Sequence, residues 1–278
     1  MLGAALLLPA SAASGAPTVP PPIRAAADFA LAGELTQGGW LRGTAPPGTR
    51  TVTFDGEPIP LDRDGAFFVA FDRDASASAV LTAKLADGRT VTRALAIAPR
   101  SWRIENVDTP LLPPEVPDAE FRRRRAAELA QIAAARATRT DAAGWRQRFV
   151  WPAAGRISGL FGAQRIYRGT PAAYHTGLDI AGAAGTPFVA PADGVVILAA
   201  AEPFTLEGHL LMIDHGMGLS SAFLHCSALL VRVGDHVRQG QALGLIGMTG
   251  RATGPHLHWG LKWREARLDP LLFVGRSG

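Results

Sequence analysis

Cysteine, lysine and long apolar runs are scarce in this sequence. Cys226 is the only cysteine among 278 residues, which excludes an internal disulfide framework and a zinc site built from cysteines. No run of 18 apolar residues occurs, so no transmembrane segment is predicted. Lys84 and Lys262 are the only lysines, so nearly all the cations behind the net charge of +4 are arginines. No basic patch is interleaved with aromatic residues, and the sequence therefore predicts no nucleic-acid partner.

Apolar residues are nevertheless plentiful enough to form cores. They make up 47% of the chain against 19% charged residues, which excludes global disorder, and the length allows one or two domains. Residues 1–27 differ from the rest, because an apolar segment precedes Pro9 and a run of small residues with an Ala-x-Ala match. This pattern lacks a basic start, but it predicts a secretory signal followed by a proline-rich linker, and hence a secreted or periplasmic protein.

Residues 28–99 have the pattern of a small β domain. Three Asp-Gly pairs, Asp55-Gly56, Asp64-Gly65 and Asp87-Gly88, each lie between runs of β-prone residues. Asp-Gly between such runs is a strong hairpin signal. Several short strands in about 70 residues predict an immunoglobulin-like β-sandwich. The segment contains no histidine, so we expect a role in packing, positioning or wall association, or simply as a spacer.

Residues 100–148 predict a linker that contains one helix at about 118–139. Asp118 follows a proline-rich stretch and is a good N-cap, and the residues after it are mostly Ala, Arg, Glu and Leu. The apolar stripe on this helix is narrow, and Arg122–Arg125 would form a solvated face. We interpret the segment as a linker helix between domains; docking onto an anionic surface is the alternative.

Residues 149–278 are predicted to form the working domain. The segment is rich in glycine and β-prone residues, and it holds every histidine of the chain: His175, His209, His215, His225, His236, His256 and His258. Such a concentration of one titratable residue type in one half of a chain is typical of a functional site.

Two motifs in this domain have the spacing of a metal site. His256 and His258 follow the turn signal Gly254-Pro255, and in a strand residues two apart point to one face. His175 and Asp179, four apart on extended chain, also share a face. Histidine and carboxylate ligands suit Zn²⁺, and three protein ligands leave a fourth position for water. The candidate ligands are therefore His175, Asp179 and one of His256 and His258.

Other hydrolytic chemistries lack their motifs here. The sequence has no His-Glu-x-x-His, no Gly-x-Ser-x-Gly and no Ser-x-x-Lys. Cys226 lies beside His225, but adjacent strand residues face opposite ways, so the pair is not expected to form a catalytic dyad. We expect Cys226 to be a small buried hydrophobe instead.

The region from Gly159 to Pro270 closely resembles the lysostaphin/LytM-type metallopeptidases of peptidase family M23. The matching motifs are His175-x-Gly177-x-Asp179, Gly185-Thr186-Pro187-Phe188-Val189-Ala190, Gly194-Val195-Val196, Ile213-Asp214-His215-Gly216, Phe223-Leu224-His225, Val231-x-x-Gly234-Asp235-x-Val237-x-x-Gly240-Gln241, Gly247-x-Thr249-Gly250 and Thr253-Gly254-Pro255-His256-Leu257-His258. The 150 residues before them lie outside the resemblance.

The resemblance implies a mainly β fold, with an antiparallel β-sheet or sandwich peptidase domain of the LytM type after the small sandwich and the helix. It implies that His175, Asp179 and His258 bind Zn²⁺, and that His225 and His256 are catalytic. Arg165 precedes the His175 motif, where the family often has an arginine, so the resemblance also suggests it as a substrate contact. His215 is expected to be structural, and His209 and His236 are expected to be surface or hydrogen-bonding residues.

The implied activity is a zinc endopeptidase that hydrolyses peptide cross-links of peptidoglycan, with the peptide stems as partners. Two other functions fit the same pattern: a non-catalytic activator of another wall hydrolase, and a zinc-dependent wall-binding module. Degenerate activators typically lack zinc ligands, and all five positions are filled here, which favours the enzyme. The sequence leaves both direct diaminopimelate cross-links and glycine bridges open as the cleaved bond, and it does not identify a regulatory partner.

Overall fold

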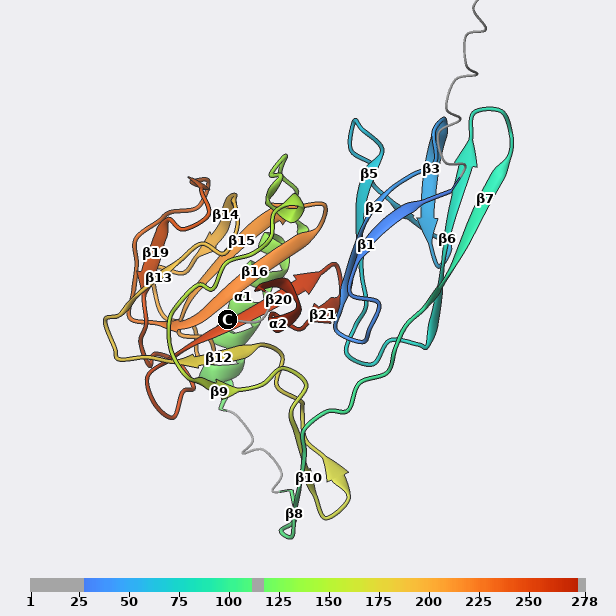
Figure 1. Ribbon diagram of the computed structural model, residues 1–278. Coiled ribbons are helices and arrows are strands. Elements are labelled where there is room, and N and C mark those ends of the chain that lie inside the picture. Colours follow the sequence, from blue (N-terminus) through green and yellow to red (C-terminus); the bar gives the residue numbers. More distant parts are fainter. Residues whose placement is uncertain (1–27, 112–117, 275–278) are drawn as a thin grey trace, which may run out of the picture.

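The computed structural model describes residues 28–111 and 118–274, and the leader predicted in residues 1–27 lies outside them. The fold is mainly β, as predicted, with antiparallel sheets in two bodies that lie side by side (Figure 1). No helix in the described ranges combines the length and the apolar character needed to cross a membrane.

The N-terminal body is a sandwich of a three-stranded and a four-stranded sheet. Their orders are β1-β2-β5 and β4-β3-β6-β7. The strand bounds are β1 Ala30–Gly33, β2 Trp40–Thr44, β3 Thr49–Phe54, β4 Glu57–Ile59, β5 Ala66–Ala70, β6 Ser78–Leu85 and β7 Thr90–Ala96. The core between the sheets is apolar, and Phe67, Leu81 and Val52 are each at most 1% exposed. Burial of such side chains stabilises the domain by about 1.5–3 kcal/mol each.

Two of the three Asp-Gly pairs close hairpins as predicted. Asp55 and Gly56 have φ of 49° and 86° between β3 and β4, which is the two-residue turn that requires positive φ at both positions. The Asp87 turn joins β6 to β7. The hairpin predicted at Asp64-Gly65 is wrong, because β5 pairs with β2 in the opposite sheet rather than with β4. The Asp64 carboxylate accepts a hydrogen bond from Ala66 N, so the pair forms a local turn at a sheet-to-sheet crossing.

The C-terminal body is built on one large antiparallel sheet of order β18-β14-β15-β16-β20-β12-β9, with β21 paired to β20. Its strands are β9 Ile157–Gly159, β12 Leu178–Ala181, β14 Gly194–Ala199, β15 His209–Gly216, β16 Leu219–Cys226, β18 His236–Val237, β20 His256–Trp263 and β21 Ala266–Leu268. A small sheet of order β13-β19-β17 packs beside it, with β13 Pro187–Val189, β17 Ala228–Leu229 and β19 Ala242–Leu245. The chain closes with α2, Leu271–Val274.

Alternate residues of the large sheet point to two different environments. Phe223, Trp259, Leu257, Leu178 and Ile180 are fully buried on one face and form the core with the small sheet. The opposite face carries both polar side chains and a second apolar cluster, and it is covered in part by a helix. Because side chains alternate along a strand, this second face receives the even-numbered residues of β20 and, as far as Leu224, of β16.

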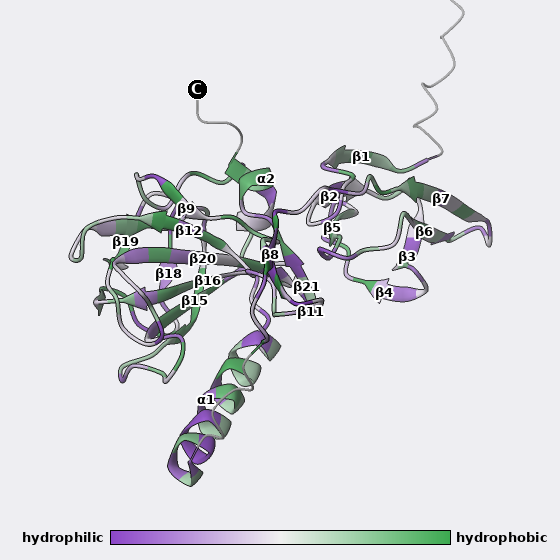
Figure 2. Ribbon diagram, turned by 90° about the horizontal axis from the view of Figure 1, so that it is seen from below, coloured by the Kyte–Doolittle hydropathy of each residue, from purple (hydrophilic) through white to green (hydrophobic). Residues whose placement is uncertain are grey.

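The connection between the two bodies contains a strand and a helix. Strand β8 (Ile104–Val107) pairs in parallel with β10 (Gln164–Tyr167), which also pairs with β11 (Thr170–Pro171). Helix α1 spans Ala119–Ala137, and the Asp118 side chain accepts a hydrogen bond from Phe121 N at its N-terminus. The helix carries both hydrophilic and hydrophobic residues along its length (Figure 2).

Besides linking the bodies in sequence, α1 lies on the large sheet. Ala135 packs in a cluster with Ile197, Leu198, Leu210 and Met212 of β14 and β15. Near the other end of the helix Arg125 Nη2 donates to Glu207 Oε1 at 2.8 Å. Glu128 is buried and accepts a 2.8 Å hydrogen bond from Thr205 N and another from Thr205 Oγ1. Polar contacts at one end and apolar contacts at the other thus fix α1 across the strands.

The two bodies share one continuous core. The Trp40 ring of the N-terminal sandwich lies 5.2 Å from the Phe273 ring of α2, and Trp40 Nε1 donates to Leu272 O. Arg100 Nη2 donates to Asp269 Oδ2 at 2.7 Å, and Asp269 is only 2% exposed. Arg100 is half-buried, so its removal would leave the buried Asp269 carboxylate without its charged partner. Experiments on the C-terminal body are therefore best made with the full chain.

Candidate metal centre

Three side chains of the C-terminal body converge on one point. His175 Nε2 lies 3.1 Å from Asp179 Oδ1 and 3.1 Å from His258 Nδ1, and His258 Nδ1 lies 2.8 Å from Asp179 Oδ1. Within residues 28–111 and 118–274 they form the one group of three or more such side chains whose donor atoms all lie within 4.8 Å of one another. The structure thus brings together His175 and Asp179 with one member of the His-x-His pair.

Strand pairing places two of the three donors. Asp179 of β12 and His258 of β20 are direct cross-strand partners in an antiparallel ladder, and directly opposite residues project side by side. His175 comes from the loop before β12, and its Nδ1–H donates to Leu160 O at 3.0 Å. That hydrogen bond fixes the tautomer, so the Nε2 lone pair faces the other two donors.

Two glycines leave space for these side chains. A Cβ on Gly159 would lie 2.3 Å from Asp179 Oδ2, and a Cβ on Gly177 would lie 2.6 Å from His258 Nε2. A Cβ atom this close would force the Asp179 carboxylate and the His258 imidazole out of their positions. Both positions therefore require glycine for packing reasons, which gives the central glycine of the His175-x-Gly177-x-Asp179 motif a physical role.

The donor set fits a divalent cation of the zinc type. Tetrahedral ligands at 2.0–2.1 Å from Zn²⁺ are about 3.3 Å apart, close to the separations seen here. Burial alone would raise the pKa of Asp179, but hydrogen bonds with His175 and His258 outweigh it and hold this pKa below its usual range. Burial also lowers the pKa of His258, which favours the neutral imidazole. An ionised carboxylate and neutral imidazole are the protonation states that bind a metal ion.

Two more histidines face this cluster without belonging to it. His225 Nδ1–H donates to Thr249 O at 2.8 Å, and His256 Nδ1–H donates to Gly254 O at 2.8 Å. Their ring centroids are 4.9 Å apart, and the His256 Nε2 atom lies 3.8 Å from Asp179 Oδ1. Because Nδ1 carries the proton in each ring, both Nε2 atoms keep a lone pair. Burial lowers the pKa of His225, with nearby His256 and His258 adding to the effect, so a neutral base is favoured.

A bulge in β16 directs His225 toward the cluster. The register between β15 and β16 shifts, since His209 is opposite Cys226 whereas Leu211 is opposite Phe223. His225 has φ of 65°, a left-handed conformation that is uncommon for residues other than glycine, although asparagine, aspartate and histidine adopt it more often than most. The bulge reverses the alternation, so His225 turns to the face of the cluster and Cys226 enters the core with no exposure. Local strain of this kind is common at functional sites.

The remaining histidines lie elsewhere, as expected for structural or surface residues. His215 is fully buried; its Nδ1–H donates to Asp193 O, and its Nε2 accepts from Ser221 Oγ, both at 2.7 Å. His209 Nδ1 lies 3.0 Å from Ala200 O, and His236 is exposed on β18. These three rings are not part of the converging group.

The His215 network predicts a loss of stability in acid. Burial lowers the pKa of His215 to about 4, against 6.5 for an ordinary histidine, so between these values the unfolded chain binds more protons than the folded one. Stability contributed by neutral His215 is complete above pH 6.5 and falls by about 3 kcal/mol as the pH drops to 4. Urea unfolding of the full chain with chelator, at pH 7 and at pH 4, measures this. His215→Gln should show a smaller difference than His236→Gln; equal differences would contradict the assignment.

Arg165 does not approach the cluster through any contact in the described ranges. It lies on β10, where its Nε donates to Glu105 Oε2 of β8 at 2.9 Å, and both side chains are more than half exposed. The pair ties the linker strand to β10. Its predicted contact with substrate stays a prediction.

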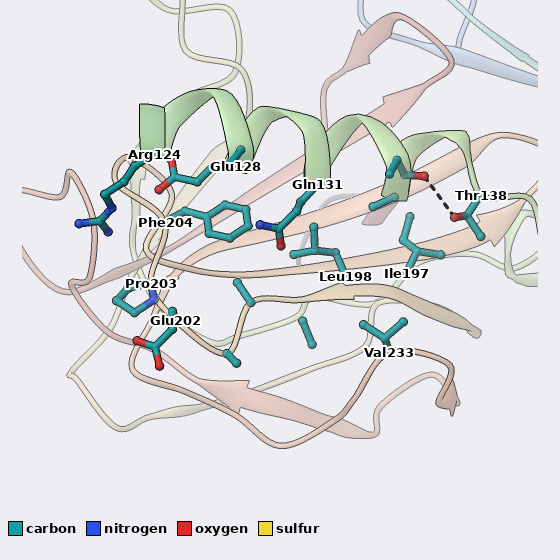
Figure 3. Close-up of a pocket in the computed structure, with 16 residues that line it drawn as sticks. Arg124, Glu128, Gln131, Thr138, Ile197, Leu198, Glu202, Pro203, Phe204 and Val233 are labelled. Carbon is teal, nitrogen blue, oxygen red and sulfur yellow. Dashed lines mark hydrogen bonds between the residues drawn. The ribbon is translucent and has the colours of Figure 1, made fainter. Parts of the chain in front are cut away.

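Helix α1 forms a roof over the face that carries the cluster. Between helix and sheet lies a cavity of about 280 Å³, which we call the roofed chamber, lined by Leu129 and Ile132 of α1, Met212 and Leu224 of the sheet, and His258. The other side of α1 borders a wider hollow of about 740 Å³, where Gln131 of the helix faces Ile197 and Leu198 (Figure 3). The second hollow is lined by none of the five residues at the cluster.

Comparisons with known proteins agree with this geometry. Residues 173–270, which contain all five residues at the cluster, match the model of peptidase family M23. This segment of the C-terminal body therefore has the sequence of an M23-type domain. Over 116 residues it is 40% identical to the peptidoglycan DD-endopeptidase ShyA of Vibrio cholerae, covering 41% of this chain and 26% of ShyA. Over 118 residues it is 40% identical to the DD-carboxypeptidase/endopeptidase Mpg of Neisseria meningitidis, covering 41% and 25%.

A crystal structure of a Pseudomonas aeruginosa protein assigned to peptidase M23 is similar over most of the chain. The TM-score is 0.66 at 27% identity, with 88% of this chain and 96% of that chain covered. The similarity therefore extends beyond the M23 domain to the N-terminal sandwich. The matches to ShyA and Mpg, in contrast, span only about a quarter of the length of those relatives.

Several groups that support the site have no signal in the sequence. Three main-chain carbonyls, those of Leu160, Thr249 and Gly254, orient the imidazoles, and any residue type can supply a carbonyl. The Arg125–Glu207 pair lies beside the site because Glu207 O accepts from His225 N. Sequence reasoning placed Arg125 on a solvated face, since its partner is 82 residues away.

Proposed function

We propose that the protein is a zinc-dependent endopeptidase that hydrolyses peptide cross-links of bacterial peptidoglycan. The observation that carries this proposal is the convergence of His175, Asp179 and His258 beside two further histidines with free Nε2 atoms. Three protein ligands leave one position for water or substrate, which is typical of catalytic rather than structural zinc sites.

His175 Nε2, Asp179 Oδ1 and His258 Nδ1 would hold the ion. When bound, zinc supplies a Lewis acid that polarises a peptide carbonyl and lowers the pKa of coordinated water to about 7. The hydrogen bond from His175 Nδ1–H to Leu160 O holds the ring in place and raises its basicity as a ligand.

His225 and His256 would perform the proton transfers. Each ring is anchored through Nδ1–H to a carbonyl, so its Nε2 can accept the proton of the attacking water and return it to the leaving amine. The ring that does not act as base can, once protonated, stabilise the oxyanion. Because the unperturbed pKa of histidine is about 6.5 and burial lowers that of His225, a neutral base is available at neutral pH.

The substrate assignment is supported by the relatives. ShyA is named a peptidoglycan DD-endopeptidase, and Mpg a DD-carboxypeptidase/endopeptidase. We therefore favour cleavage of a D,D bond in the cross-linked peptide stems over cleavage of glycine bridges. A peptidoglycan substrate also requires a location in the cell envelope, in agreement with the secretory signal predicted from residues 1–27.

Digestion of isolated sacculi tests the proposal. The purified full chain, loaded with zinc, is incubated with sacculi, and the released muropeptides are separated with and without chelator. We expect cross-linked dimers to disappear and monomers to increase only without chelator. An unchanged muropeptide profile from zinc-loaded protein would contradict the endopeptidase and favour an activator of another wall hydrolase.

A further inference from the structure

The roofed chamber has a cationic end that the proposed chemistry does not use. Arg136 of α1 and the pair Lys262 and Arg267 of the β20–β21 hairpin all line it. Lys262 and Arg267 are direct cross-strand partners, and like charges directly opposite each other destabilise a hairpin. Arg136 adds a third positive charge beside them, since it interacts electrostatically with Arg267.

Two carboxylates, Glu265 and Asp72, lie beside this cluster, and Asp72 Oδ2 accepts a 2.8 Å hydrogen bond from the main-chain N of Arg267. Lys262 Nζ lies 2.7 Å from Glu265 Oε2, but the Glu265 side chain is 96% exposed, and such surface pairs are weak. Glu265 is also the one carboxylate that interacts with Arg136. Among the described residues, the Arg136 guanidinium has no hydrogen-bond partner, although Arg136 is partly buried between α1 and the sheet. An unpaired, partly desolvated guanidinium is well suited to bind a carboxylate.

The cationic end lies at a defined distance from the metal centre. His258 and Lys262 belong to the same strand and face, four residues apart, which corresponds to about 13 Å. Arg125, eleven residues before Arg136 on α1, contacts Glu207 beside His225. The helix therefore runs from the catalytic histidines to the cationic end, and the chamber connects them along β20.

We propose that Arg136, Lys262 and Arg267 form a carboxylate-binding subsite of the substrate groove, which holds a peptide by a free carboxylate a few residues from the cleaved bond. The proposal rests on the proposed peptidase function and specifies its substrate as an acidic peptide. Helix α1 is then part of the substrate site, since it contributes one of the three cations. Bidentate pairing with the Arg136 guanidinium fixes the register of the peptide relative to His258.

Kinetics with paired substrates test the subsite. A fluorogenic cross-linked peptide dimer with free carboxylates is compared with the same dimer in which those carboxylates are amidated. The full chain should cleave the acidic form with a kcat/KM about 10-fold higher or more, mainly through KM, because a charged hydrogen bond is lost in the amide. Arg136→Gln should remove this preference, by lowering kcat/KM on the acidic dimer toward its value on the amidated dimer. Arg123→Gln, an exposed arginine of the same helix, should keep the preference.

A binding measurement separates failure of the subsite from failure of the peptidase. Fluorescence anisotropy with the full chain in chelator measures affinity for both dimers without cleavage. Tighter binding of the acidic dimer that Arg136→Gln abolishes supports the subsite even if neither dimer is cleaved. Equal affinity for both dimers, no binding of either, or an equal loss in Arg136→Gln for both substrates would overturn it. Thermal unfolding of each variant confirms that the fold is kept.

Discussion

His258→Ala is expected to lose its metal ion and all measurable cleavage. His258 Nδ1 lies 2.8 Å from Asp179 Oδ1 and 3.1 Å from His175 Nε2, so its removal leaves two of the three proposed ligands. Loss of groups that only orient a ligand costs 10–100-fold in metal affinity, and loss of a ligand itself should cost more. Metal analysis after dialysis should find one zinc per chain in the wild type and about none in the variant.

The control for this experiment is His236→Ala, which deletes an exposed imidazole of β18 outside the cluster. It should keep both zinc and activity toward sacculi. Stoichiometric zinc in His258→Ala would show that the ligand set is wrong. Loss of zinc in both variants would point to damage of the fold instead, which urea unfolding would reveal.

Loss of the His225 imidazole should separate metal binding from turnover. Its Nε2 faces the cluster but is not one of the converging donors, so the variant should keep one zinc per chain. General acid–base catalysis by a positioned side chain contributes about 10²–10⁴-fold, and kcat should fall by that factor. Zinc content and the rate of dimer loss from sacculi are measured on the same preparation.

The residue that replaces His225 must be able to adopt the positive φ of this position. His225 has φ of 65°, where alanine is strained and asparagine is tolerated better. His225→Asn is therefore the main variant, and His225→Ala the comparison. If both keep zinc and lose turnover, the imidazole is responsible; if only the alanine variant is impaired, the effect comes from the backbone and the catalytic assignment is wrong.

The periodicity of strands predicted much of the site. Residues two apart share a face, and the structure shows His256 and His258 on the same side of β20, both near Asp179. The prediction required only that the segment is extended. The assignment of His258 rather than His256 as a metal ligand came from the family resemblance, because strand periodicity places both histidines on the same face.

The position of His225 could not be derived from periodicity. Simple alternation in β16 puts residue 225 with Phe223 in the core and residue 226 on the open face. The bulge reverses this order, and its cause is a pairing between β15 and β16 that depends on the turn at Gly208 and the contact of His225 N with Glu207 O. Such a register shift arises from tertiary packing, so local sequence does not predict it.

The Asp-Gly pairs of the N-terminal sandwich also show that local sequence does not determine how strands pair. Asp55-Gly56 specifies the backbone of a turn, and the flanking strands then pair with each other. Asp64-Gly65 also makes a turn, yet the strand after it joins the other sheet. Turn chemistry determines where the chain reverses, whereas burial of β5, whose five residues are all buried, determines which partner it takes.

The position of α1 limits what can reach the metal centre. The helix lies across the sheet and is anchored at Glu207 and Thr205. Helix and sheet together line the pocket that borders His258, which is only 8% exposed. Under the proposed function, this restriction would favour the slender peptides that join glycan strands over folded proteins.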